Sequence, residues 1–136
     1  MIQRLQTVWL LLASACAFLS MKFPFYFIAM HPETTSDQFN ATNNMILLIL
    51  TAILATLCLF TIFVFKQRKL QLWLTVLAIV ISLLNIFLYF TYKKDNPGGG
   101  IALTSVFVFL IPIFLILAAR GIYKDQKLVR SMDRLR

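Results

Sequence analysis

Charged side chains are scarce in this chain: they make up 13% of its 136 residues, and only 5 residues are Asp or Glu. None of its long apolar runs contains an Asp, Glu, Lys, Arg or His residue. Proton-coupled transporters relay protons through buried carboxylates or histidines, and aspartyl intramembrane proteases need paired acids. The absence argues against both classes. It also removes the general acid or base that most membrane enzymes require.

Cysteine and histidine are rare as well, with two and one residues. A disulfide between Cys16 and Cys58 can be neither deduced nor excluded from sequence, and buried, inert thiols are the expectation. His31, Glu33 and Asp37 stand in one polar loop, but one histidine with two acids at irregular spacing is a poor zinc signature. We therefore predict no catalytic, cofactor or metal site, and no enzymatic activity.

Apolar residues are abundant, at 60% of the chain with a mean hydropathy of +0.84. A water-soluble core of this length could not hide so much apolar surface. A helix needs about 20 apolar residues to cross a ~30 Å hydrocarbon layer, and outer-membrane strands would alternate apolar and polar residues instead. Four uninterrupted runs fit helices that span a membrane: residues 5–21 (extended by 23–30), 45–65, 70–90 and 101–119.

The basic residues predict the orientation of these helices. With a cytoplasmic N-terminus, ten basic residues fall on the inner side and three (Lys22, Lys93 and Lys94) on the outer side, which together make the 13 in the chain. The positive-inside rule then places both termini in the cytoplasm. Aromatic anchors are expected near the inner boundary at Trp9, Trp73 and Tyr123, and near the outer boundary at Tyr26, Tyr89 and Tyr92.

The first run has some features of a lipoprotein signal, because Arg4 precedes a leucine-rich stretch that ends in Ala13-Ser14-Ala15-Cys16. Two features oppose cleavage. Ala13 stands where a leucine is expected, and the residues after Cys16 are apolar rather than a polar tether. We expect an uncut membrane anchor.

A few uncharged polar side chains lie inside the four apolar runs. Ser82 and Asn85 lie three residues apart and share one face of the third helix, which makes them the candidate intramembrane polar face. Asn85 is expected either to form an interhelical hydrogen bond or to mark a polar point in a pore or lipid pocket, and the first is favoured.

Small residues spaced four apart predict close packing of the helices into a left-handed bundle. The pairs are Ala13 with Ala17, Thr51 with Ala55, Ala52 with Thr56, and Ala78 with Ser82. Pro112 is expected to bend the fourth helix, and Pro24 the outer end of the first.

The last residues predict a basic amphipathic helix, because Leu128, Met132 and Leu135 recur on one side of a helix. Gly121 is expected to form a weak joint before it. Such a helix can lie on anionic headgroups, dock on the inner loop or bind a partner. The candidate contacts with headgroups or a partner are Arg4, Lys66, Arg68, Lys69, Lys124, Lys127, Arg130, Arg134 and Arg136.

The two ends of the chain carry a resemblance. The segment 1–7, Met-Ile-Gln-Arg-Leu-Gln-Thr, leads into a leucine-rich helix, and the segment 124–136 is Lys-Asp-Gln-Lys-Leu-Val-Arg-Ser-Met-Asp-Arg-Leu-Arg. Together they resemble a family of small Bacteroidota inner-membrane proteins classed as a domain of unknown function. The resemblance implies four transmembrane helices in a bacterial inner membrane, and it implies no activity.

These observations predict an all-α membrane protein with a bundle of four transmembrane helices and both termini in the cytoplasm. The helices are expected at about 5–29, 45–65, 70–91 and 101–120, in a transmembrane domain of residues 1–122 followed by a basic tail of residues 123–136. The expected function is that of a non-enzymatic accessory, assembly or scaffold protein, and the alternative is a small oligomeric channel or carrier. The expected partners are the bilayer, its anionic headgroups, and a membrane protein or a second copy of the chain, but not nucleic acid.

Overall fold

Each of the four apolar runs contains an α-helix in the computed structural model, which describes residues 2–28, 37–39, 44–64, 66–95 and 100–133. Its four α-helices within these ranges are α1 (Ile2–Lys22), α2 (Met45–Phe63), α3 (Arg68–Asp95) and α4 (Val106–Asp133). All four are long and apolar enough to cross a membrane. A single turn of 3-10 helix, η2 (Leu103–Ser105), precedes α4.

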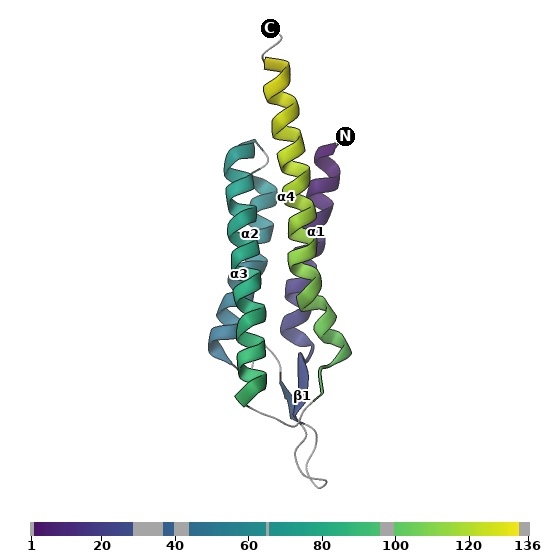
Figure 1. The fold of residues 1–136 in the computed structure, drawn as a ribbon, viewed down its shortest axis with the longest axis vertical. Helices are drawn as coiled ribbons and strands as arrows, with labels where there is room; N and C mark the ends of the chain where they lie inside the picture. Colours follow the sequence, from purple (N-terminus) through teal and green to yellow (C-terminus); the bar gives the residue numbers. More distant parts are fainter. Residues whose placement is uncertain (1, 29–36, 40–43, 65, 96–99, 134–136) are drawn as a thin grey trace.

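The helices form an up-and-down bundle in which each packs against its neighbours in the chain, and α4 closes the ring against α1. The short connection between α2 and α3 favours this arrangement because it leaves those two helices antiparallel. Figure 1 shows both termini at one end of the bundle, together with the connection between α2 and α3. The bundle therefore has one end that holds the termini and an opposite end that holds the strands.

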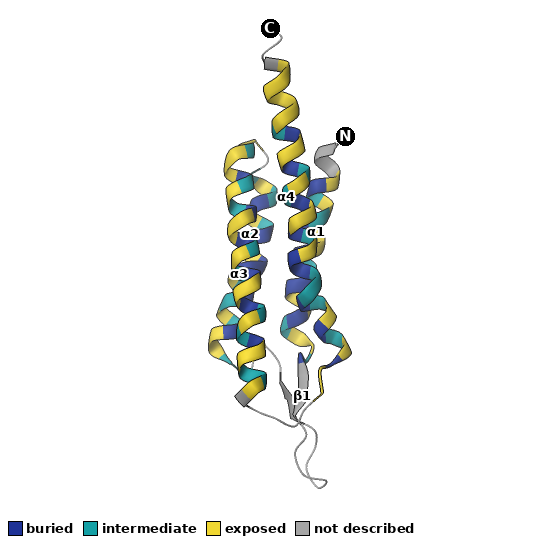
Figure 2. Ribbon diagram, viewed as in Figure 1, coloured by how far each residue is buried: buried dark blue, intermediate teal, exposed yellow. Residues whose placement is uncertain are grey.

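Small side chains line the middle of the bundle, where alanines of all four helices lie in one buried cluster with Cys16 and Cys58. Three of the four predicted small-residue pairs are buried there or beside it, whereas Ala52 is half-buried and Thr56 is exposed. Both cysteines are free thiols. Small residues let helix backbones approach closely, which is how helices gain packing contacts in lipid. Figure 2 shows the exposed residues on the outside of the bundle and the buried ones between the helices.

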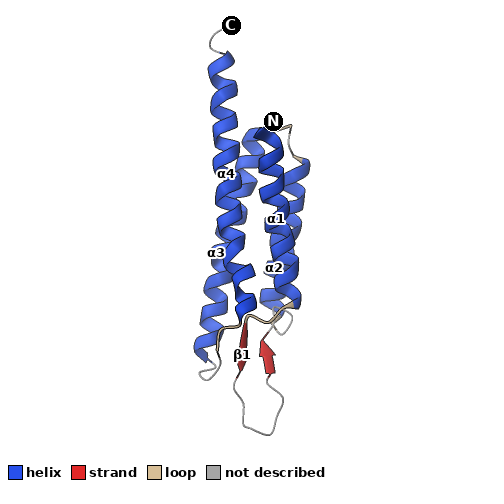
Figure 3. Ribbon diagram, turned by 90° about the vertical axis from the view of Figure 1, so that its right-hand side faces the viewer, coloured by secondary structure: helices blue, strands red, loops and turns tan. Residues whose placement is uncertain are grey.

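The first helix is shorter than expected, because α1 ends at Lys22 rather than near residue 29. Two short antiparallel strands, β1 (Tyr26–Ile28) and β2 (Asp37–Phe39), follow it and pair in the register Tyr26 with Phe39. Figure 3 shows the two strands side by side below the helices. The prediction of a helix was wrong over the described residues 23–28, since Pro24 disfavours helical backbone at Phe23. Pro24 thus lies beyond the helix that it was expected to bend, and the strand pair was not foreseen.

Phe25 fills the end of the bundle beside these strands. Its ring is 1% exposed and stacks on Tyr89, with centroids 4.2 Å apart. The Phe25 carbonyl accepts a hydrogen bond from the Ala102 amide at 3.0 Å, and the Thr104 hydroxyl donates to the Pro24 carbonyl. Tyr89 is therefore a core residue of this end and not the boundary anchor that the sequence suggested.

The fourth helix continues well past the expected end at residue 120. α4 runs unbroken to Asp133, so neither Gly121 nor the expected boundary at 122/123 interrupts it. Figure 1 shows its last turns extending beyond the other three helices, and residues 127–132 are all exposed. We call residues 126–133 the α4 arm. Pro112 lies inside α4, and Figure 1 shows the first part of this helix turning away from the bundle axis.

Candidate functional site: a basic groove at the end that holds the termini

A buried hydrogen bond fastens the base of the α4 arm to the start of α1. The Gln6 side-chain amide donates to an Asp125 carboxylate oxygen at 2.7 Å, and both residues are buried. One turn earlier on α4, Gly121 leaves room for the Gln6 side chain: a Cβ there would lie 2.8 Å from Gln6 Cγ. Gly121 therefore allows α1 and α4 to approach closely, and it does not form the weak joint in the helix that the sequence suggested.

The start of α3 lies on the other side of Asp125. Arg68 Nη1 is 3.4 Å from the Asp125 carbonyl oxygen, a long hydrogen bond, so α3 also contacts the base of the arm. The first turn of α3 holds Arg68 and Lys69 and no acid. This is unfavourable by itself, because the amino end of a helix already carries partial positive charge. An anion near this turn would relieve the repulsion.

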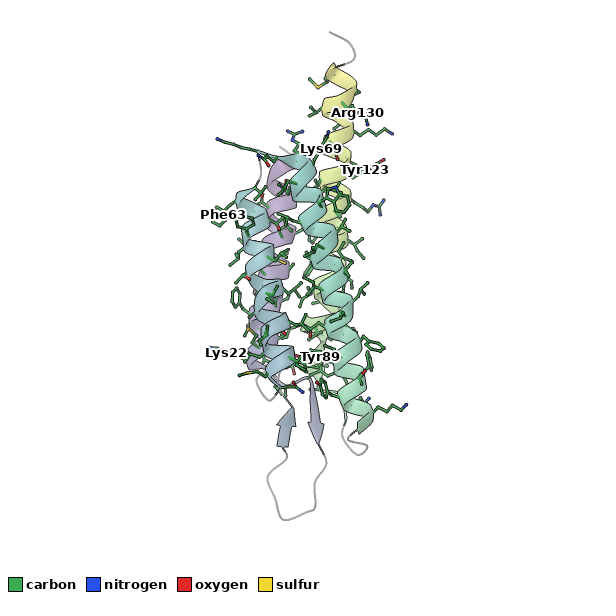
Figure 4. The ribbon with its side chains drawn as sticks, turned by 90° about the vertical axis from the view of Figure 1, so that its left-hand side faces the viewer. Lys22, Phe63, Lys69, Tyr89, Tyr123 and Arg130 are labelled. Atoms are coloured by element: carbon green, nitrogen blue, oxygen red, sulfur yellow. The ribbon has the colours of Figure 1, made fainter. Side chains whose placement is uncertain are left out.

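A groove of about 1210 Å³ runs between the α2–α3 connection and the α4 arm. We call it the upper groove. Its walls are basic and polar, with Lys66, Arg68 and Lys69 on one side and Tyr123, Gln126, Lys127, Val129, Arg130 and Ser131 from α4. Figure 4 shows Lys69, Tyr123 and Arg130 together at this end, far from Lys22 and Tyr89 at the opposite end.

A smaller groove of about 540 Å³, the lower groove, continues from it between α3 and α4. Tyr123 and Lys127 line both grooves, and the lower one adds Leu72, Ala119, Arg120 and Lys124. The surface of the lower groove is almost wholly apolar. No acidic side chain lines either groove in the part of the chain that the structure describes. The site therefore offers a basic upper groove and, below it, a groove whose surface is apolar although three of its six lining residues are basic.

The predicted contact residues are partly brought together here. Lys66, Arg68, Lys69, Lys127 and Arg130 line the upper groove and Lys124 lines the lower one. Arg4 belongs to α1, but its side chain is outside the described part of the structure, as are Arg134 and Arg136.

Sequence reasoning missed Gln6, Asp125 and Arg120. A weak signal was present, because Gly121 and Asp125 are one helical turn apart and so share a face of α4. Nothing in the sequence paired that face with Gln6.

The candidate intramembrane polar face lies in the interior, toward the opposite end. The Asn85 amide donates to the Thr51 hydroxyl at 3.1 Å, which joins α3 to α2. Ser82 donates to the Ile79 carbonyl of its own helix. Asn85 Oδ1 and the Tyr89 hydroxyl are buried without a hydrogen bond of ordinary geometry, and the Tyr89 hydroxyl faces Thr51. Asn85 thus joins helices and also leaves a buried polar atom unsatisfied.

Metal-binding groups do not gather in the described ranges, where no three His, Cys, Asp or Glu side chains come together. The loop residues His31 and Glu33 lie outside those ranges, and only the backbone of Asp37 is described, in β2.

The fold and the groove define a class: small four-helix proteins whose helices are long and apolar enough to cross a membrane, with a basic groove at the end that holds both termini. Within that class, the chain belongs to the family described as Domain of unknown function (DUF4293), whose model matches residues 2–135. No curated protein and no solved structure matches the chain.

Proposed function

We propose that this protein is a non-enzymatic accessory or assembly protein of a bacterial inner membrane, with both termini in the cytoplasm. Its basic grooves contact anionic headgroups, and its α4 arm contacts a partner membrane protein. The positive-inside rule supports the orientation, because the basic residues gather at the end that holds the termini.

The α4 arm carries the proposal. It is helical, exposed on all sides over residues 127–132, and fastened at its base by the bond between Gln6 and Asp125. Leu128 and Met132 lie one turn apart on it and are 52% and 70% exposed. Exposed apolar side chains beyond the bundle are typical of a contact with another protein.

Co-purification from native membranes followed by mass spectrometry tests the partner. The variant Leu128→Ala/Met132→Ala is expected to recover roughly 30-fold less of a partner that the unaltered chain retains, because each truncation removes about 1 kcal/mol of interface contact. The matched control is Leu83→Ala/Phe87→Ala, which has the same spacing on the exposed side of α3. Recovery of the chain alone, or equal loss in both variants, would contradict the proposal.

The buried Asn85 Oδ1, which has no hydrogen-bond partner among the described residues, favours a second candidate, a small oligomeric channel or carrier. Buried polar atoms in lipid are costly unless water or a solute meets them. Flux of ions or small solutes into liposomes that contain the purified protein is expected to fall severalfold in Asn85→Leu but not in Thr56→Val, which changes an exposed polar residue of α2. The absence of flux for every solute would rule this candidate out.

A further inference from the structure

The two grooves are stacked along the bundle axis. Leu72 follows Arg68 by four residues on α3, and Ala119 precedes Tyr123 by four on α4. Since the two helices are antiparallel, both steps of four residues lead about 6 Å deeper into the bundle. A molecule that enters the basic upper groove thus reaches apolar surface directly below it.

The basic walls of the upper groove stand on opposite sides. Lys66, Arg68 and Lys69 come from the start of α3 and the connection before it, and Lys127 and Arg130 come from α4. The Asp125 carboxylate does not balance them, because it is buried and hydrogen-bonded to Gln6 of α1. The partial positive charge at the amino end of α3 adds to the same field. A single phosphate carries too little negative charge to balance the five basic residues of the groove, Lys66, Arg68, Lys69, Lys127 and Arg130.

We propose that the stacked grooves bind one anionic phospholipid with two phosphates in its headgroup, such as a diphosphatidylglycerol. One phosphate lies against each basic wall of the upper groove, and an acyl chain lies along Leu72 and Ala119 in the lower groove. Basic pockets between helices on the cytoplasmic side of a membrane suit such headgroups. The inference rests on the proposed function for placing this end of the bundle at a membrane surface.

The position of the cations along α4 agrees with a lipid. The headgroup region on each side of a bilayer is roughly 5–7 Å thick. From Arg120 to Lys127 the helix rises about 10 Å, more than the thickness of one headgroup region, so the long side chains of Arg120 and Lys124 must extend toward the phosphates to reach their level. A soluble anion would use the upper groove alone and leave the apolar lower groove without a ligand.

Native mass spectrometry of the detergent-purified full chain, titrated with diphosphatidylglycerol or phosphatidylglycerol at equal phosphate, tests the headgroup. We expect preferential retention of diphosphatidylglycerol, and a loss of affinity of roughly tenfold or more in Arg68→Gln/Lys127→Gln, because each removes a charge-assisted contact. The control Lys93→Gln/Lys94→Gln removes the same charge from the far end of α3 and is expected to bind normally. Equal retention of both lipids, or equal loss in variant and control, would overturn the proposal.

A second pair of variants tests the acyl chain. Ala119→Phe fills the lower groove and is expected to weaken diphosphatidylglycerol binding severalfold. The control Ala52→Phe makes the same substitution at a half-buried alanine of α2, which lines neither groove, and is expected to leave the binding unchanged. Unchanged binding in Ala119→Phe would show that the acyl chain does not lie in the lower groove. Displacement of the lipid by inorganic pyrophosphate or an acidic peptide at equal concentration would assign the groove to a soluble ligand instead. Leu128 and Met132 line neither groove. A negative result in the lipid test therefore leaves the proposed partner contact unaffected, and a negative result in the partner test leaves the lipid site unaffected.

Discussion

Replacing Gly121 with leucine is expected to lower the free energy of unfolding by about 3 kcal/mol and to loosen the α4 arm. A Cβ at this position would lie 2.8 Å from Gln6 Cγ, so a larger side chain must displace Gln6. The Asp125 carboxylate then loses its buried donor, which costs roughly 1–3 kcal/mol in addition to the overpacking. Unfolding in mixed micelles measures the stability, and amide hydrogen exchange over the arm measures the loosening.

The change Gly121→Ala tests whether the side chain of Gln6 causes this loss of stability, because its effect on stability is expected to be opposite in the presence and in the absence of Gln6. In the unaltered chain we expect a loss of stability, because even one methyl group meets Gln6. In a Gln6→Ala background the same change is expected to stabilise α4 by up to about 1 kcal/mol, since alanine is the better helix former and nothing opposes it. The same sign in both backgrounds would show that Gln6 and Gly121 do not meet.

Replacing Phe25 with alanine is expected to have an effect of similar size at the other end, lowering the free energy of unfolding by about 3 kcal/mol. The ring is 1% exposed, stacks on Tyr89, and meets Phe90 edge-on at 6.3 Å and Phe109 at 6.1 Å. Its removal leaves a cavity among residues of α3 and α4 that the helices cannot close without moving. The same unfolding assay measures the loss.

Phe87→Ala is the matched control, because Phe87 is 69% exposed on the outside of α3. Lipid or detergent tails replace its contacts, so its truncation is expected to cost less than about 1 kcal/mol. Comparable losses for Phe25→Ala and Phe87→Ala would mean that Phe25 does not close the end of the bundle.

Together the two ends indicate different tasks for the same bundle. The end with the strands is closed by an aromatic cluster around Phe25 and Tyr89. The end with the termini holds an open basic groove and an arm fastened by one buried hydrogen bond. Recognition by this protein is therefore expected at the groove and the arm, and the strand end is expected to give stability.

Much of the fold follows from the chain alone. Uninterrupted apolar runs of about 20 residues predict helices because lipid leaves no other partner for the backbone. The expected start of the second helix at residue 45 agrees with α2, and its end differs by two residues. The end of the first helix was misplaced, because an apolar aromatic stretch is compatible with either helix or strand. Periodicity alone does not separate them over so few residues.

By itself, the sequence determined that this protein has four apolar helices, a short connection between the second and the third, and basic residues grouped at one end, since these follow from hydrophobicity, length and the positions of Lys and Arg. Only the tertiary structure decided which polar residues meet. Gln6 and Asp125 are 119 positions apart in the chain, and no local spacing encodes their contact. The same holds for the grooves, because the walls formed by Arg68 and Lys127 exist only when α3 and α4 pack side by side.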